Sequence, residues 1–70
     1  MKTLEYKLTG EYIELFKLLK LLHVASSGGE AKTMIETGDI VLNDEVELRK
    51  RAKIRCGSII QNGDITIKVS

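Results

Sequence analysis

The 70-residue chain has one cysteine, one histidine and no proline. One cysteine cannot close an intramolecular disulfide, and with one histidine it supplies too few ligands for a structural zinc site. A chain this short buries only about 60% of its extended surface on folding. Stability must therefore come from an apolar core, which the 43% hydrophobic content can supply. Because no repeat, low-complexity tract or linker is visible, we expect one domain over residues 1–70.

The sequence also lacks a long uncharged apolar run. Its longest apolar stretch, residues 12–24, is interrupted by Glu14, Lys17, Lys20 and His23. This stretch is too short and too charged to span a bilayer, which needs about 20 mostly apolar residues. The amino end alternates polar and apolar residues, unlike a secretory signal. We therefore expect a cytoplasmic protein without a membrane partner.

Positive charge is concentrated in one short segment. The whole chain has 11 Lys and Arg against 10 Asp and Glu, for a net charge of +1. Residues 1–48 carry an excess of acidic side chains, whereas residues 49–55 contain five basic residues and no acidic one. The five are Arg49, Lys50, Arg51, Lys53 and Arg55. This focused charge indicates an anionic partner more strongly than the net charge does.

If this segment is extended, alternate side chains project to opposite sides. One side would hold four cations, Arg49, Arg51, Lys53 and Arg55. The other side would hold Lys50, Ala52, Ile54 and Cys56. The four cations would form a ridge about 20 Å long, and arginine's planar fork suits phosphate.

An alternative reading of the basic segment is a solvated rim. Its arginines would then pair with Glu45 and Glu47, and such surface pairs contribute about 0–1 kcal/mol each. The sequence alone leaves both readings open.

Two helices are predicted, separated near residue 25. Residues 12–24 place apolar side chains at helical spacing, with Thr9 or Gly10 as the N-cap. His23 would lie at the end of this helix, where the helix dipole or a last-turn carbonyl would give it a structural role.

The second predicted helix has signals at both ends. Ser27 followed by Glu30 is a capping box, and Gly38 is placed to end the helix in a left-handed conformation. Gly28 and Gly29 in the first turn permit close approach of another backbone. The free N–H groups of this turn would also favour an anion, although helix capping alone explains the serine and the glutamate.

Strand signals flank the two helices. Residues 4–8 alternate as in a half-buried strand, and Asn43-Asp44 predicts a hairpin turn that pairs Val41 with Val46. Two further strands are expected around a turn at Asn62-Gly63. The expected order is therefore one strand, two helices and four strands.

This order of features resembles the S-four RNA-binding domain, a family named after small-subunit ribosomal protein four. The family pattern runs roughly serine-x-x-glutamate-alanine, then isoleucine, glycine, valine, asparagine and a late glycine. The matching residues here are Ser27, Glu30, Ala31, Ile35, Gly38, Val41, Asn43 and Gly57-Ser58-Ile59-Ile60. The resemblance covers about residues 12–60 and looks most like the small stand-alone bacterial members. It implies an α+β fold, with a two-helix RNA-binding motif packed on a small, mostly antiparallel sheet.

Some family positions differ in this chain. Family members often carry arginine where Tyr12 and Gly28 stand, and aspartate where Ser58 stands. RNA contacts would therefore shift to Lys32 and the basic segment. The resemblance implies binding of structured RNA in a ribosomal or tRNA context. Because the sequence shows no catalytic motif and no metal-ligand spacing, we expect a non-enzymatic, monomeric module without a cofactor. The expected contact residues are Lys32, Arg49, Lys50, Arg51, Lys53 and Arg55, with Ser27, Gly28 and Gly29 at the second helix start.

Two other functions remain open. A protein–protein adaptor would use the apolar first helix, and its binding would be insensitive to salt. A helix-turn-helix DNA binder would have only Lys32 on its second helix to contact bases and phosphates.

Overall fold

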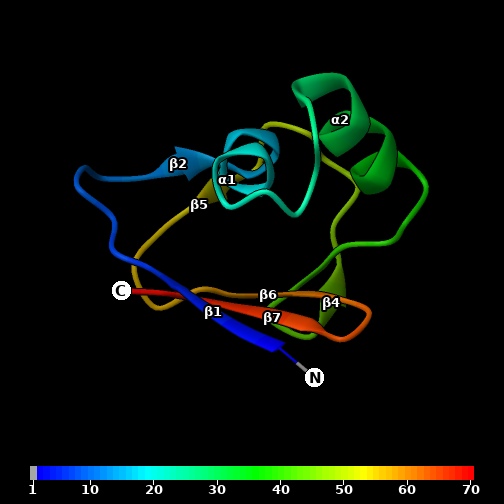
Figure 1. Ribbon diagram of the computed structural model, residues 1–70. Helices are drawn as coiled ribbons and strands as arrows, with labels where there is room; N and C mark the ends of the chain where they lie inside the picture. The colour runs from blue at the N-terminus through cyan, green and yellow to red at the C-terminus, as the bar shows by residue number, and fades with distance from the viewer. Residues whose placement is uncertain (1) are drawn as a thin grey trace.

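The helices lie on one side of a sheet in the computed structural model, which describes residues 2–70 (Figure 1). The elements in chain order are β1 (Lys2–Tyr6), β2 (Ile13–Glu14), α1 (Leu15–Leu21), α2 (Gly28–Glu36), β3 (Val41–Leu42), β4 (Glu45–Val46), β5 (Lys53–Ile54), β6 (Ile59–Asn62) and β7 (Ile65–Val69). Within residues 2–70 neither helix is long and apolar enough to cross a membrane.

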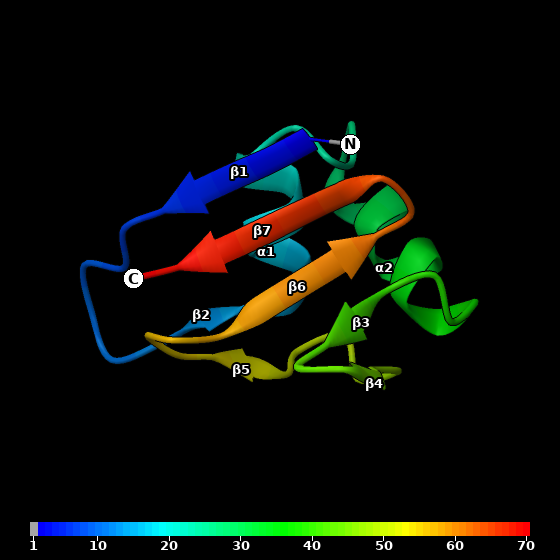
Figure 2. The same ribbon diagram turned by 90° about the horizontal axis from the view of Figure 1, so that it is seen from below.

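The main sheet has five strands in the order β1-β7-β6-β3-β4 (Figure 2). Only the β1–β7 pair is parallel, and the other pairs of this sheet are antiparallel. Beyond the β1–β7 ladder, Ser70 N donates to Tyr6 O at 2.9 Å and Leu8 N donates to Ser70 O at 2.8 Å. The predicted α+β class and mostly antiparallel sheet are confirmed.

The core lies between the helices and the main sheet. The fully buried side chains of α1 are Leu15, Leu18 and Leu19, and those of α2 are Ala31 and Ile35. They face Ile60, Ile67 and Val69 of the sheet, which belong to the same buried cluster. Burying a leucine or isoleucine side chain contributes about 1.5–3 kcal/mol to the stability of the fold. Because Leu15, Leu18 and Leu19 are all buried here, most of the apolar stripe of α1 belongs to this core.

The structure contains two short strands that the sequence did not predict. β2 and β5 pair antiparallel and form a separate two-stranded sheet beside α1 (Figure 1). Two-residue strands are too short to show an alternating pattern. The predicted helix over residues 12–24 therefore wrongly includes residues 13–14.

The predicted start of the first helix is therefore wrong. The N-cap is Glu14 rather than Thr9 or Gly10, and it makes no side-chain cap hydrogen bond. Instead, the first two amides of α1 donate to the basic segment: Leu15 N to Ala52 O at 3.0 Å, and Phe16 N to Lys50 O at 3.1 Å. These bonds satisfy donors that a helix start otherwise leaves free.

Both helices end in the same left-handed turn, a Schellman motif. At the end of α1, His23 has φ 61°, its N–H donates to Lys20 O at 3.1 Å, and Val24 N donates to Leu19 O at 2.9 Å. Gly38, with φ 84°, takes the matching place after α2, as predicted. His23 therefore has a structural role at the helix end, through its backbone. A side chain in this conformation costs roughly 1–2 kcal/mol compared with glycine.

The predicted cap of α2 is confirmed for Ser27, whose Oγ accepts a hydrogen bond from Glu30 N at 3.1 Å. The Glu30 carboxylate reaches one residue further back than predicted. It accepts hydrogen bonds from Ser26 N at 3.1 Å and from Ser26 Oγ at 2.8 Å. The backbone bond, followed by the hydroxyl bond, lowers the pKa of Glu30.

The first hairpin is as predicted. Val41 pairs with Val46, and both turn residues, Asn43 and Asp44, have positive φ values of 49° and 72°. Asn43 also ties the turn to the next strand, because its Oδ1 accepts a hydrogen bond from Ile59 N at 2.9 Å.

The last turn lies one residue later than predicted. Asn62 pairs with Ile65, so the two turn residues are Gly63 and Asp64 rather than Asn62 and Gly63. The Asn62 side chain donates to Asp39 O at 3.0 Å, which holds this residue in the strand.

Candidate nucleic-acid interface

The two-stranded sheet determines which side chains face outward beside α1. Ile13 pairs with Ile54, and Glu14 pairs with Lys53. Ile54 is fully buried, so this pair faces the core. Because side chains alternate along a strand, Glu14 and Lys53 face outward, and the neighbouring residues Tyr12 and Arg55 share that outer face.

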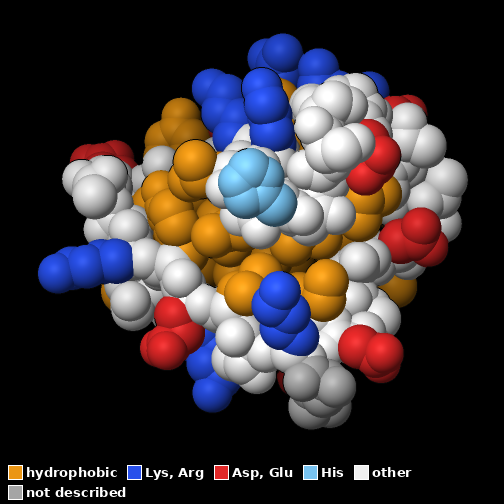
Figure 3. All heavy atoms as spheres, viewed as in Figure 1, with side chains coloured by type: hydrophobic (Ala, Val, Ile, Leu, Met, Phe, Trp, Pro, Cys, Tyr) orange, Lys and Arg blue, Asp and Glu red, His pale blue; other side chains and the backbone are white. Residues whose placement is uncertain are grey.

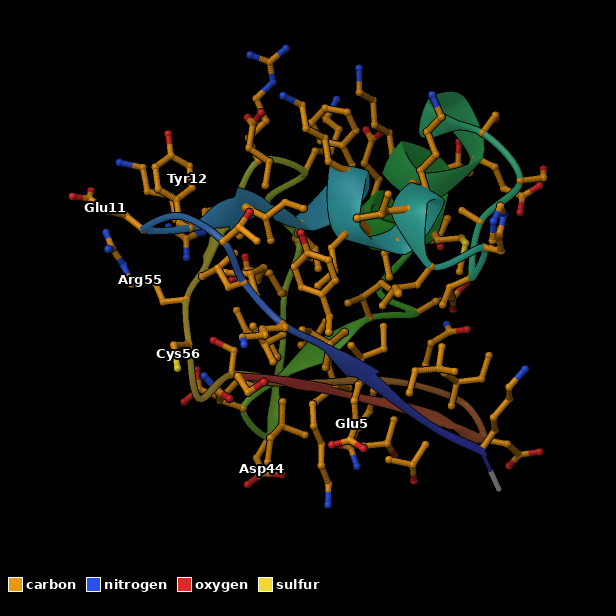
Figure 4. The ribbon with its side chains drawn as sticks, turned by 60° about the vertical axis from the view of Figure 1, so that its left-hand side comes forward. Glu5, Glu11, Tyr12, Asp44, Arg55 and Cys56 are labelled. Atoms are coloured by element: carbon orange, nitrogen blue, oxygen red, sulfur yellow. The ribbon has the colours of Figure 1, made fainter. Side chains whose placement is uncertain are left out.

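The first cluster on this face surrounds Tyr12. Lys53 Nζ lies 5.1 Å from the centroid of the Tyr12 ring, and Arg55 Cζ lies 6.0 Å from it. Such cation–π contacts at exposed sites contribute about 0.5–1 kcal/mol. Figure 4 shows Tyr12 and Arg55 at one end of the molecule, projecting away from its body.

A second cluster surrounds Phe16 at the start of α1. Lys32 Nζ of α2 lies 4.9 Å from the Phe16 ring centroid, and Lys17 Nζ lies 6.0 Å from it. A Cβ atom on Gly28 would lie 4.0 Å from Phe16 Cδ2. The start of α2 therefore lies beside α1 at an ordinary contact distance, and the close backbone approach predicted for the glycine pair is not seen. The contact brings Lys32 to the same side as the helix start.

The predicted single ridge is wrong for the first part of the basic segment. Residues 50–51 form a turn, in which Ala52 N donates to Arg49 O at 3.2 Å, and β5 begins only at Lys53. The turn allows the carbonyls of Lys50 and Ala52 to reach the first amides of α1. Ala52 and Ile54 are buried, as predicted for the inner side.

Two other residues assigned to the inner side are exposed. Lys50 lies on the turn, and its side chain is 45% exposed. Cys56 lies beyond the end of β5, next to Gly57 with φ 92°, where strand alternation no longer applies. The inner positions predicted for Lys50 and Cys56 are therefore wrong.

The first three basic residues of the segment have acidic partners. Arg49 makes a two-bond contact with Glu47, with Nε at 3.0 Å from Oε2 and Nη2 at 3.1 Å from Oε1. This hydrogen bonding lowers the pKa of Glu47 and raises the pKa of Arg49. The alternative prediction, that the arginines pair with nearby acidic residues at the surface, is therefore confirmed for Arg49 and Glu47.

The next two cations have longer contacts with other elements. Lys50 Nζ lies 3.6 Å from Glu36 Oε1, and Arg51 Nε lies 3.8 Å from Glu14 Oε2. Glu14 also forms a salt bridge with Lys17, with Nζ at 3.0 Å from Oε1. Residues 49–51 are therefore close to carboxylates supplied by three different parts of the fold.

Three of the predicted contact residues differ from these. Within residues 2–70, Lys32, Lys53 and Arg55 have no carboxylate oxygen within 4.0 Å. Each lies over an aromatic ring instead. Figure 3 shows Lys and Arg side chains gathered along the top of the molecule, on the side of α1 and α2.

The α2 start is a poorer anion site than its sequence indicated. The Ser27 hydroxyl is engaged with Glu30 N, and the Glu30 carboxylate stands at the same turn. That negative charge opposes a phosphate at these amides. Of the two glycines, only Gly28 lies beside Phe16, and a Cβ atom there would make an ordinary contact.

Sequence reasoning missed Tyr12 and Phe16 as members of this surface. The predicted helix over residues 12–24 places both in its apolar stripe. The available signal was the alternation of Tyr12 and Glu14 opposite Lys53 and Arg55, which becomes visible only when β2 and β5 are paired.

The sequence model of the S4 domain family matches residues 6–70. The chain is 36% identical over 58 residues to the "Putative RNA-binding protein YbcJ" of Escherichia coli (strain K12), covering 83% of each chain. It is 35% identical over 51 residues to the "Probable ribosome maturation protein RlbA" of Bacillus subtilis (strain 168), covering 73% of this chain and 72% of that protein.

Two solved structures have the same fold. The solution structure of YbcJ from E. coli gives a TM-score of 0.72 at 33% identity, covering 93% of this chain and 84% of that chain, and is described as revealing "a recently discovered ALFAL motif involved in RNA-binding". The C-terminal domain of a tyrosyl-tRNA synthetase gives a TM-score of 0.70, covering 100% of this chain and 79% of that chain. At 19% identity this second likeness concerns the fold alone. The family match and the relatives confirm the resemblance seen in the motifs, and the chain belongs to the S4 domain family.

Proposed function

We propose that this protein is a binding module for structured RNA, and that it acts through a basic–aromatic face. This face consists of Tyr12, Phe16, Lys17, Lys32, Lys53 and Arg55. The observation that carries the proposal is the state of Lys32, Lys53 and Arg55. They have no carboxylate within 4.0 Å among residues 2–70. Lys32 lies over Phe16 of α1, and Lys53 and Arg55 lie over Tyr12, just before β2.

The chemistry of this face suits a nucleic acid. Lysine and arginine neutralise phosphates, and arginine can hold one through two parallel hydrogen bonds. Aromatic rings offer flat surfaces for bases that have left a helix. The face joins both helices to the small sheet, so a ligand bound there would contact several elements at once.

The relatives support RNA as the anionic partner. One carries RNA binding in its name, and the solved structure of that relative is described by an RNA-binding motif. Another carries ribosome maturation in its name. We infer a ribosomal or tRNA context for this chain, with Arg49, Lys50 and Arg51 in supporting positions beside the basic–aromatic face.

The protein–protein adaptor has weaker support. It requires a free apolar face on α1, but Leu15, Leu18 and Leu19 are fully buried. Leu21 is exposed at 54% and lines a hollow of about 360 Å³ together with Lys17, Lys20 and His23. The exposed lining of this hollow is mostly apolar, so it leaves a small apolar site beside two lysines rather than a free helix face. The salt dependence of binding distinguishes the two functions.

The test is RNA affinity over a salt series, measured by fluorescence anisotropy with a labelled RNA hairpin. Each phosphate contact contributes about 0.7–0.9 to the slope of log affinity against log salt. If the three cations without acidic partners each contact a phosphate, log affinity should fall by at least about 2 for each unit increase in log salt. Absent binding, or binding that is insensitive to salt between 50 and 200 mM, would contradict the proposal and favour the adaptor.

A further inference from the structure

Tyr12 is an aromatic residue that the core does not use. The chain has two tyrosines, one phenylalanine and no tryptophan. Tyr6 and Phe16 pack against the buried cluster, whereas Tyr12 does not belong to it and is 43% exposed. Burial in the core therefore does not account for this ring.

The surroundings of Tyr12 are basic on the strand side. Lys53 of β5 and Arg55, just after this strand, lie over its ring, with Nζ and Cζ at 5.1 Å and 6.0 Å from the centroid. Glu11, the residue before Tyr12, projects at the same end of the molecule (Figure 4). Glu14 lies on the same face opposite Lys53, but its carboxylate contacts Lys17 and Arg51, so it is already balanced by other cations. Lys53 and Arg55 against Glu11 then leave a positive balance around an exposed ring.

We propose that Tyr12 is a stacking platform for one unpaired base, and that Lys53 and Arg55 hold the phosphates on either side of that nucleotide. This inference rests on the proposed function and narrows its ligand to an RNA helix interrupted by a bulge or a loop. Bases inside a helix have both faces covered by their neighbours, whereas an unpaired base offers a free face to an aromatic ring. Because every base has such a face, the site selects RNA structure rather than sequence.

Phe16 has a different role on the same surface. Its ring is half-buried, packs against the core and lies next to Gly28. It holds Lys32 over the junction of the two helices, where the lysine is placed for a backbone phosphate. The unpaired base is therefore assigned to Tyr12 alone.

The experiment uses two RNA hairpins that differ by a single bulged 2-aminopurine, a base analogue whose fluorescence falls on stacking. The wild-type protein should bind the bulged hairpin about tenfold more tightly than the paired one, and should quench the analogue. Tyr12→Phe should keep both effects, because the ring remains. Tyr12→Leu should remove both effects and keep the salt-dependent affinity for the paired hairpin.

Ile59→Ala is the matched control, since Ile59 has the same exposed fraction of 43% and belongs to the other sheet, on β6. It should bind both hairpins as the wild type does, and circular dichroism checks that each variant is folded. Equal wild-type affinity for the two hairpins, or a bulge preference that survives Tyr12→Leu, would overturn the stacking platform while leaving RNA binding intact. Failure of the wild type to bind either hairpin would overturn both proposals.

Discussion

The two halves of the basic segment have the same charge and different surroundings. Arg49, Lys50 and Arg51 lie within 4.0 Å of carboxylates from Glu47, Glu36 and Glu14. Lys53 and Arg55, only a few residues later, lie over the Tyr12 ring instead. The count of basic residues therefore does not give the number of charges that a ligand can use.

The difference comes from the backbone. Residues 50–52 turn so that their carbonyls accept hydrogen bonds from the start of α1, and this places the turn among the acidic side chains around that helix. β5 then runs beside β2, which Tyr12 directly precedes. The following predictions test whether this difference decides how RNA is bound.

The largest effect is expected from Lys53→Gln combined with Arg55→Gln. Loss of two phosphate contacts should weaken RNA binding roughly 10- to 30-fold at physiological salt and flatten the salt slope by about 1.4–1.8. The matched control is Arg49→Gln combined with Lys50→Gln, which removes the same charge from the paired half. Its slope should change by less than half as much. Equal changes in the two double variants, measured by anisotropy over a salt series, would abolish the distinction.

A smaller loss is expected from Lys32→Gln. This lysine has no acidic partner within residues 2–70, so its loss should flatten the slope by about 0.7–0.9 and weaken binding roughly fivefold. Lys68→Gln is the control. Lys68 lies on β7 and faces away from the helices, so its loss should leave the slope unchanged. An effect of Lys68→Gln as large as that of Lys32→Gln would mean that the field of the whole molecule, rather than this face, controls affinity.

Glu47→Gln should make Arg49 available to a ligand, as Lys53 and Arg55 already are. The variant frees Arg49 from its two-bond contact with the carboxylate, so RNA binding should strengthen about two- to fivefold with a steeper salt slope. The change should disappear in the Glu47→Gln/Arg49→Gln double variant. If it persists there, the gain comes from removing a negative charge and not from releasing Arg49.

The smallest effect concerns stability in acid. The pKa of Glu47 is lowered mainly by its hydrogen bond from Arg49, so the folded state binds this proton less readily than the unfolded state. The stability from this pair is present above the unfolded pKa of about 4.3 and is lost as the pH falls through the lower folded value. Urea unfolding between pH 6 and pH 3 should show a shallower loss for Glu47→Gln than for the wild type. Parallel curves would show that the pair does not contribute.

Local signals made much of the fold predictable. Ser27, Gly38 and the Asn43-Asp44 turn each act on their own neighbours, so the cap, the helix end and the hairpin could be recognised in the sequence. β2 and β5 could not, because a two-residue strand has no pattern and forms only when a distant segment lies beside it. For the same reason, the sequence did not indicate that Tyr12 lies on the outer face beside Lys53 and Arg55. The RNA contacts assigned to Lys32 and to the basic segment stay predictions.

The position of β7 has a consequence for how the chain folds. β7 is made after every other element, yet it lies between β1 and β6, and β1 has no other partner in the sheet. Closing a loop of this length costs roughly 3–4 kcal/mol of chain entropy, which only the finished β1–β7 ladder and the burial of Ile67 and Val69 can offset. During synthesis, β1 therefore waits unpaired while the helices and the first hairpin can already form from local contacts. Completion of the main sheet is thereby expected only after β7 has been made, whereas the β3–β4 and β3–β6 pairs can form before it.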